Sequence, residues 1–192
     1  MSKTADKNRV TGTAGAPLTV TRKELLVNGR DDEFRAMVHA ALAFTARLHA
    51  IRDGYAELVG LSGPQYTILV SIEHLQNDGD IGVKQLADHL SLSGTFVTTE
   101  TKKLEEAGYV TKAKGQEDKR RVSLRTTPAG ASLLRRLSEF QQQVNNVHFG
   151  SLTNDEFEMM RKVMPELVAS SDAGLSLLKH LSMVNTLGAE TD

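Results

Sequence analysis

The first sustained hydrophobic pattern of the chain runs from residue 31 to about residue 57. Phe34, Val38 and Leu48 recur at the spacing of one helical face, and neighbouring apolar residues widen that face. The three acids at 31–33 suit the positive end of a helix dipole. The pattern predicts a long amphipathic helix whose apolar face is broader than a helix at the edge of a small domain needs.

A second helix is predicted from residue 63 to Leu75. Ser62 can cap its first turn, and Pro64 is favourable at the opening of a helix. The segment "QNDGD" that follows is typical of a turn. Ile81 and Val83 then predict a short strand.

Two short helices are predicted at residues 84–90 and 94–106, separated by a tight break at "SLS". Ser93 can cap the second of them, and Gly108 can end it. Two short helices joined by a three-residue turn form the helix-turn-helix arrangement.

The next two runs, "GYVTKA" and "RRVSLRTT", are rich in β-prone residues and flank a polar loop that contains glycine. This combination predicts a β-hairpin.

Helical periodicity returns after the hairpin and dominates the rest of the chain. Pro128 opens a predicted helix that reaches about Phe149, and a capping box at Thr153 opens another. Pro165 and Gly174 are expected to interrupt that second helix, which leaves a last amphipathic piece, "LSLLKHLSMV".

Residues 1–30 show no sustained period and are predicted to be a mobile, mildly basic arm with a short ordered piece near "KELLVNG". The predicted fold class is mainly α with a small β-hairpin wing: a winged helix-turn-helix domain with N- and C-terminal dimerisation helices. The predicted organisation is an arm at 1–30, a first helix at 31–60, a winged domain at 61–127 and C-terminal helices at 128–188.

Composition narrows the class of protein. The chain has 192 residues, 24% of them charged, and a net charge of −1. It lacks cysteine, which excludes a disulfide framework, a thiol nucleophile and redox sensing through a thiol. We find neither an apolar run long enough to span a membrane nor a secretory signal, and we therefore expect a cytoplasmic protein.

The charge is unevenly distributed. Residues 112–125 contain six Lys or Arg against two acids, whereas residues 126–192 contain eight acids against five bases. A near-neutral chain can still carry such a local basic patch, and the local field is what attracts a polyanion.

The predicted helix at 94–106 has two different faces. Val97 and Leu104 would seat it on the core, while an opposing stripe is formed by Thr95, Thr98, Thr99 and Lys102. Such a short polar face can enter a major groove about 12 Å wide. Alternatively it is an ordinary solvated face, and the basic hairpin directly after it favours the DNA-binding interpretation.

Several of these motifs together resemble MarR-type transcriptional regulators. They are "LSGPQYTIL", "LADHLSLSGTFVTTETKKLEEAGYV", the D-x-R of residues 118–120 and the L-x-x-T-x-x-G of residues 124–130. The resemblance covers about 120 of the 192 residues and implies a winged helix-turn-helix that binds double-stranded DNA.

The resemblance implies that Arg120 enters a minor groove at the wing tip while Asp118 orients it through a charge-assisted bond. Lys114, Lys119 and Arg121 would neutralise phosphates beside it. From the residues alone, Asp118 and Arg120 could equally be a solvated turn pair worth under about 1 kcal/mol. The full set of predicted DNA contacts is Thr95, Phe96, Thr98, Thr99, Lys102, Lys103, Lys114, Asp118, Lys119, Arg120 and Arg121.

Three positions depart from the family pattern. Thr99 stands where relatives often carry Arg, Gly94 replaces a polar or basic residue, and Glu100 replaces an aliphatic one. These departures suggest that the wing carries much of the affinity.

The resemblance further implies a homodimer that binds a palindromic operator, acts as a repressor rather than an activator, and is released by a small aromatic acid or phenol. The broad apolar helices agree with dimerisation, although packing within one chain is the alternative. Arg35 and Arg47 could bind a carboxylate, and His39 or Tyr66 could bind a phenol or a ring. Either arginine could instead be an ordinary solvated or ion-pairing residue.

We find no catalytic constellation and expect no enzymatic activity, no cofactor and no metal, since the six histidines show no H-x-x-x-H spacing. Two rival functions are a helical dimer that binds a small molecule and a winged-helix module that binds proteins. Both predict no DNA affinity of the salt-dependent kind.

Overall fold

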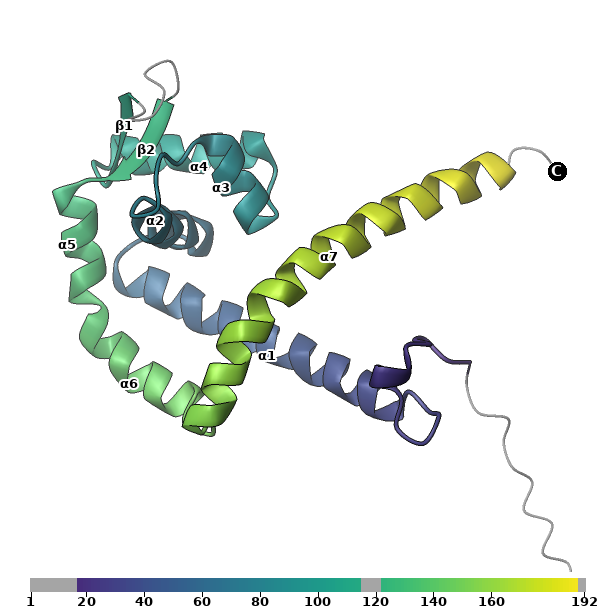
Figure 1. Ribbon diagram of the computed structural model, residues 1–192. Helices are drawn as coiled ribbons and strands as arrows, with labels where there is room; N and C mark the ends of the chain where they lie inside the picture. Colours follow the sequence, from purple (N-terminus) through teal and green to yellow (C-terminus); the bar gives the residue numbers. More distant parts are fainter. Residues whose placement is uncertain (1–16, 115–121, 190–192) are drawn as a thin grey trace, which may run out of the picture. The chain divides into compact units, whose positions relative to one another are not determined.

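The computed structural model describes residues 17–114 and 122–189, and Figure 1 labels its elements along the chain. The elements are the 3-10 helix η1 (Lys23–Leu25), α1 (Asp32–Leu58), α2 (Gly63–Leu75), α3 (Val83–Leu90), α4 (Gly94–Glu106), β1 (Val110–Lys114), β2 (Val122–Thr126), α5 (Pro128–Arg136), α6 (Ser138–His148) and α7 (Asn154–Ala189). A mainly helical fold with a two-stranded hairpin confirms the predicted fold class. The chain divides into two compact units, one ending at Arg135 and one beginning at Arg136.

The core of the first unit lies around α2, which packs on α1, α4 and β2, while α4 packs on α3 and β1. Apolar side chains from these elements and from α5 meet there: Ile68, Leu69, Ile72, Ile81, Leu86, Ala87, Val97, Leu104, Val110, Leu124 and Leu133. Full burial of one such leucine or isoleucine contributes about 1.5–3 kcal/mol relative to exposure.

Helices α3 and α4 confirm the predicted helix-turn-helix. The turn between them is closed by Ser91, which adopts a left-handed conformation with φ of 52°. Ser93 Oγ then accepts a hydrogen bond from the Phe96 N–H at 3.2 Å and caps α4. These local bonds fix where α4 begins.

Strands β1 and β2 pair antiparallel, with Val110 opposite Thr126 and Lys114 opposite Val122. The hairpin lies beside α4 in Figure 1. The predicted strand at 81–83 is wrong, because Val83 already begins α3. Ile81 nevertheless meets β2, where its carbonyl oxygen accepts a bond from the Leu124 N–H at 2.7 Å.

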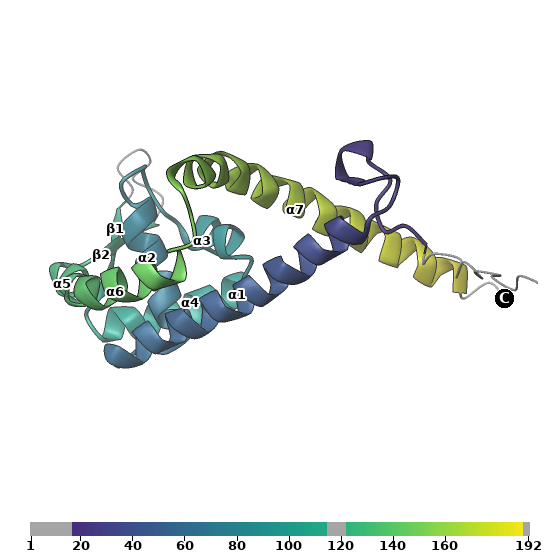
Figure 2. The ribbon, with the colours of Figure 1, turned by 90° about the horizontal axis from the view of Figure 1, so that it is seen from below.

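Helix α1 is buried only near its C-terminal end. Tyr55 and Ala56 are buried beneath α2, with the Tyr55 ring centroid 6.1 Å from that of Tyr66. The preceding turns extend away from α2, α3 and α4 (Figure 2) and expose apolar residues such as Met37 and Leu42.

The segment before α1 is held through Asp31, which is buried. The Thr19 N–H and hydroxyl donate to its Oδ2 at 2.6 and 2.7 Å, and Arg35 Nε donates at 3.1 Å. These bonds, the Thr19 N–H foremost, hold the pKa of Asp31 far below its usual value. Residues 1–16 of the predicted arm lie outside the described residues, and η1 coincides with the predicted ordered piece.

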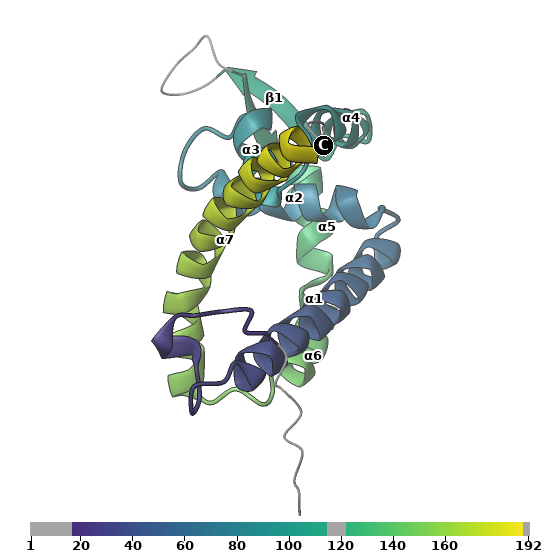
Figure 3. The ribbon, with the colours of Figure 1, turned by 90° about the vertical axis from the view of Figure 1, so that its right-hand side faces the viewer.

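The second unit contains α6 and α7. The helix predicted at 128–149 is two helices, α5 and α6, separated at Leu137. The predicted interruptions at Pro165 and Gly174 are also wrong, since α7 continues through both (Figure 3). Proline removes one helical hydrogen bond, and glycine lowers helix propensity by about 1 kcal/mol. In a helix of 36 residues, the remaining hydrogen bonds outweigh these two local costs.

Burial is scarce in this second unit. Among its described side chains only Leu137 is buried, and the apolar residues of α6 and α7 are largely exposed. Separately, none of the described helices has an apolar stretch long enough to cross a membrane.

Candidate nucleic-acid interface

Helix α4 presents the predicted polar stripe to solvent. Thr95, Thr98, Thr99 and Lys102 are all exposed, whereas Val97 and Leu104 are fully buried. The Thr98 hydroxyl donates to the Gly94 carbonyl at 2.8 Å, and the Thr99 hydroxyl donates to the Thr95 carbonyl at 3.0 Å. The hydroxyl protons are therefore used within the helix, and the oxygen lone pairs and methyl groups remain for an external partner.

Each lysine next to this stripe has an acidic partner. Lys102 lies 3.7 Å from Glu106, Lys103 lies 2.7 Å from Glu100, and Lys112 of β1 lies 2.6 Å from Glu105. The pairs of Lys102 and Lys112 are exposed and worth about 1 kcal/mol or less, whereas Glu100 in the third pair is buried. A phosphate can therefore replace Glu106 or Glu105 at little cost, although the described surface is less cationic than the lysine count suggests.

Glu100 is buried on α4, with 7% of its surface exposed. Its carboxylate accepts a bond from Gln65 Nε2 at 3.2 Å as well as from Lys103 Nζ. Gln65 also completes the capping box at the start of α2 with Ser62. The residue that departs from the family pattern thus joins α4 to α2, a role that its position in the sequence did not reveal.

The structure describes the two strands of the wing, β1 and β2. Lys114 is exposed at the end of β1. The predicted contacts Asp118, Lys119, Arg120 and Arg121 lie outside the described residues. Arg125, which we counted in the basic run, bonds instead to the turn after α2 and is only 24% exposed.

The four predicted effector residues lie in different surroundings. Arg35 donates to Asp31 and to the Pro17 carbonyl, and Arg47 donates to Ala43 within α1 at 2.9 Å. His39 is exposed and Tyr66 is buried in the core. Arg35 and Arg47 thus make the ordinary contacts that we considered as their alternative, and the effector prediction stays a prediction.

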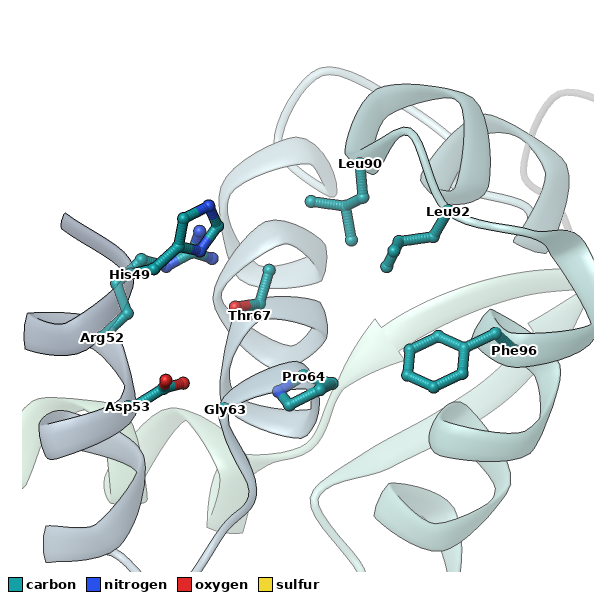
Figure 4. A pocket seen from close by; sticks show the side chains of 9 residues that line it. All are labelled: His49, Arg52, Asp53, Gly63, Pro64, Thr67, Leu90, Leu92 and Phe96. Atoms are coloured by element: carbon teal, nitrogen blue, oxygen red, sulfur yellow. The ribbon is translucent and has the colours of Figure 1, made fainter. Parts of the chain in front are cut away.

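A pocket of about 390 Å³ lies between α1, α2 and the helix-turn-helix (Figure 4). One wall is polar and comes from α1, and the other is mostly apolar and comes from α2 and the helix-turn-helix. The lining residues are His49, Arg52, Asp53, Gly63, Pro64, Thr67, Leu90, Leu92 and Phe96. None of the four predicted effector residues lines this pocket.

Two features of the pocket matter for its chemistry. Phe96 belongs to α4, so the pocket shares a side chain with the predicted DNA-binding set. Gly63 leaves room for the carboxylate of Asp53, which a Cβ at that position would strike. Sequence reasoning missed His49 and Asp53, although their i, i+4 spacing beside Arg52 on one helix was a signal.

Metal chemistry receives no support from the part of the chain that the structure describes. The described residues contain no cluster of three or more His, Asp or Glu side chains that could hold a metal ion.

The helix-turn-helix followed by an antiparallel hairpin makes this a winged helix-turn-helix protein. The MarR family model matches residues 61–122, which run from the start of α2 to β2. The chain therefore contains a MarR-family winged-helix domain, and the curated proteins that it resembles are HTH-type transcriptional regulators.

Individual relatives agree with this assignment. The chain is 28% identical over 162 residues to the HTH-type transcriptional regulator TtmR of Methylorubrum extorquens, covering 82% of this chain and 77% of that protein. Its fold is similar to that of a MarR/EmrR family transcriptional regulator from Acinetobacter, with a TM-score of 0.60 and 21% identity. This match covers 72% of this chain and 96% of that structure. It is also similar to a mutant MarR from E. coli complexed with operator DNA, with a TM-score of 0.55, 19% identity and coverage of 71% and 96%.

Proposed function

We propose that this regulator binds a palindromic operator as a homodimer, represses transcription there and is released by a small aromatic acid or phenol. The observation that carries the proposal is the exposed polar stripe of α4, seated on the core by Val97 and Leu104 and followed directly by the wing. A mutant MarR from E. coli with a similar fold was crystallised in complex with operator DNA, which supports the proposal that this chain binds DNA.

On DNA, α4 enters the major groove with its threonine stripe facing the bases. Threonine methyl groups can contact thymine methyl groups, and the hydroxyl oxygens can accept bonds from base edges. Lys102 exchanges Glu106 for a phosphate, and Lys103, whose ammonium has three donor hydrogens, contacts a phosphate while it keeps its bond to the buried Glu100.

The wing contributes the remaining proposed contacts. Lys114 neutralises phosphates together with Lys119 and Arg121, and Arg120, oriented by Asp118, inserts into the adjacent minor groove.

The second copy in the proposed dimer covers helices that the chain leaves open. Helix α7 has no buried residue among its described side chains, and it exposes Leu167, Leu175 and Leu178 by more than half. Apolar area on this scale marks an interface in soluble proteins. A two-fold dimer then places two copies of α4 about one DNA turn apart, which implies a palindromic operator.

We place the effector in the pocket between α1 and the helix-turn-helix. Arg52 can bind a carboxylate bidentately, and Pro64 and Phe96 can pack on an aromatic ring. Asp53 can accept a bond from a phenol. Because Phe96 belongs to α4, a ligand in this position favours α4 arrangements different from the DNA-bound one.

The DNA-binding part is tested by selecting duplexes from random DNA with the wild-type protein, followed by fluorescence anisotropy across a salt series. Arg120→Ala should weaken binding at least about tenfold and lower the log–log salt slope by about 1. Lys179→Ala removes one exposed positive charge from α7 and should stay within about twofold. Failure of the wild type to select any sequence would overturn the proposed function.

The effector part uses salicylate, which combines a carboxylate and a phenol, as the releasing probe. Arg52→Gln should abolish release and leave DNA affinity unchanged. Arg47→Gln is the matched control, since Arg47 lies on the same helix outside the pocket. Loss of release in the Arg47 variant alone would instead favour the effector site predicted from sequence, whereas release by neither wild type nor variant would exclude this ligand class.

A further inference from the structure

The base of the wing is fastened to the turn that follows α2. Arg125 of β2 donates from Nη1 to the Gln76 carbonyl at 2.9 Å and from Nη2 to Asp80 Oδ1 at 3.2 Å. Both side chains of the ion pair are largely buried, with 24% of Arg125 and 13% of Asp80 exposed. The planar fork of the guanidinium is thus occupied on two sides by acceptors of one turn.

Neighbouring residues of β2 repeat this attachment. The Thr126 N–H donates to Gln76 Oε1 at 3.0 Å, and Gln76 Nε2 donates to Glu73, which fixes the orientation of the amide. The Leu124 N–H donates to the Ile81 carbonyl at 2.7 Å. The bonds donated by Leu124, Arg125 and Thr126 all join β2 to the end of α2 or to the segment that follows it.

The opposite side of the hairpin has a different attachment. Lys112 of β1 bonds to Glu105 of α4, and this pair is more exposed than that of Arg125 and Asp80. The angle between the wing and α4 therefore depends on two attachments, the Lys112–Glu105 pair and the more buried Arg125–Asp80 pair. A bound DNA requires both elements to reach their grooves at once, so this angle determines whether the second contact can form.

We propose that Arg125 is a positioning residue. Through its bond to Asp80 it holds the wing in the orientation that binds DNA, and it does not itself contact phosphate. The inference rests on the proposed DNA binding of the winged domain. It assigns opposite consequences to a residue that the sequence places in the basic run: a phosphate contact gains affinity when its acidic partner is removed, whereas a positioning residue loses affinity.

The test uses the full-length protein and the duplex selected by the wild type. Asp80→Ala should weaken binding at least about tenfold, the lower end of the range expected when a hydrogen bond to a charged group is lost. Asp78→Ala is the matched control, because Asp78 is an exposed acid in the same turn and its loss reports only the change in net charge. That control should bind as tightly as the wild type or slightly more tightly.

Two further variants keep the inference decidable. Arg125→Lys retains the charge but cannot hold both acceptors, so it should weaken binding almost as much as Arg125→Ala. In the Asp80→Ala background, Arg125→Ala should add little, since the two residues act as one unit. Circular dichroism melts identify any variant that fails to fold, and Asp80→Asn then replaces it.

Tighter DNA binding by Asp80→Ala than by Asp78→Ala, or full affinity in Arg125→Lys, would overturn the positioning role and make Arg125 a phosphate contact. If the wild type selects no DNA, the proposed function fails on its own. Amide hydrogen exchange at Leu124 and Thr126 would then still test whether Asp80 anchors β2, because exchange should accelerate in Asp80→Ala and not in Asp78→Ala.

Discussion

The winged domain and the helices outside it use the same kinds of apolar side chain in opposite ways. In the winged domain, Leu69 and Leu124 are completely buried by neighbours from the same chain. On α7, Leu178 is 61% exposed, and the early turns of α1 expose Leu42 to a similar degree. One part of the chain thus contains its own core, while the other exposes the apolar faces on which the proposed dimer rests.

This contrast separates two kinds of stability. A domain with its own core unfolds with a free energy that does not depend on protein concentration, whereas a core shared between copies gains stability by mass action. Variants in the two regions can therefore be told apart by how their effects vary with concentration.

The largest expected effect comes from the core. Leu69→Ala should lower the free energy of unfolding by about 2–5 kcal/mol at every protein concentration, because it removes buried methyl groups and leaves a cavity. Urea unfolding measured at two widely separated concentrations checks this. Leu178→Ala is the counterpart, and its effect should shrink as the protein is diluted, because dissociation removes the contact that the substitution weakens. Equal behaviour of the two variants would contradict the contrast.

The next effect concerns assembly. Leu167→Glu places a charge on the exposed apolar side of α7, where burying it without a partner would cost several kcal/mol. Sedimentation velocity should show a monomer. Circular dichroism should show that this monomer keeps the helical signal of the winged domain. Glu166→Gln, one residue earlier and also exposed, should leave the assembly unchanged. A dimer that survives Leu167→Glu would remove α7 from the interface.

A smaller effect is expected at Glu100, the buried acid of α4. Glu100→Leu replaces a buried carboxylate by an apolar side chain and leaves Lys103, which is more than half exposed, in contact with water. It also frees Lys103 for phosphate, so DNA affinity should rise by up to about fivefold. Anisotropy on the selected duplex checks this, with Glu106→Leu as the exposed control on the same helix. A loss of affinity in Glu100→Leu would mean that the bond to Gln65 positions α4.

The smallest effect is a pH dependence at the start of α1. The pKa of Asp31 is lowered by bonds from Thr19 and Arg35, so its stabilising contribution is present above its ordinary pKa of about 4. That contribution is lost as the pH falls below that value. Asp31→Asn should therefore be less stable than wild type at neutral pH, and the difference should shrink in acid. Urea unfolding from pH 7 to pH 3 measures it; a difference independent of pH would argue against an ionised Asp31.

Sequence patterns captured the elements whose signals are local. The Ser93 cap and the Gly108 terminator placed α4 at its observed bounds, and β-prone runs around a glycine-containing loop placed the hairpin. Breakers were over-weighted at Pro165 and Gly174, where a long helix continues despite both penalties. Local signals identify an element but not how far it extends.

Partners distant in the chain were not accessible to the same reasoning. Arg125 looked like one more base in a basic run because Asp80, its acceptor, lies 45 residues earlier. Glu100 looked like an odd residue on a DNA-binding helix because Gln65 lies on another helix. The pocket was missed for the same reason, since it forms only when α1 meets the helix-turn-helix.

Phe96 has a consequence for the direction in which signals pass through this regulator. It lies on α4 and in the wall of the pocket, so the proposed DNA contact and the proposed ligand site share one helix. Thermodynamic linkage makes such an influence mutual: any factor by which the ligand weakens DNA binding is the factor by which DNA weakens ligand binding. Operator occupancy would then set the ligand concentration at which the cell responds, and a regulator bound to DNA would be a less sensitive detector than the same protein free of it.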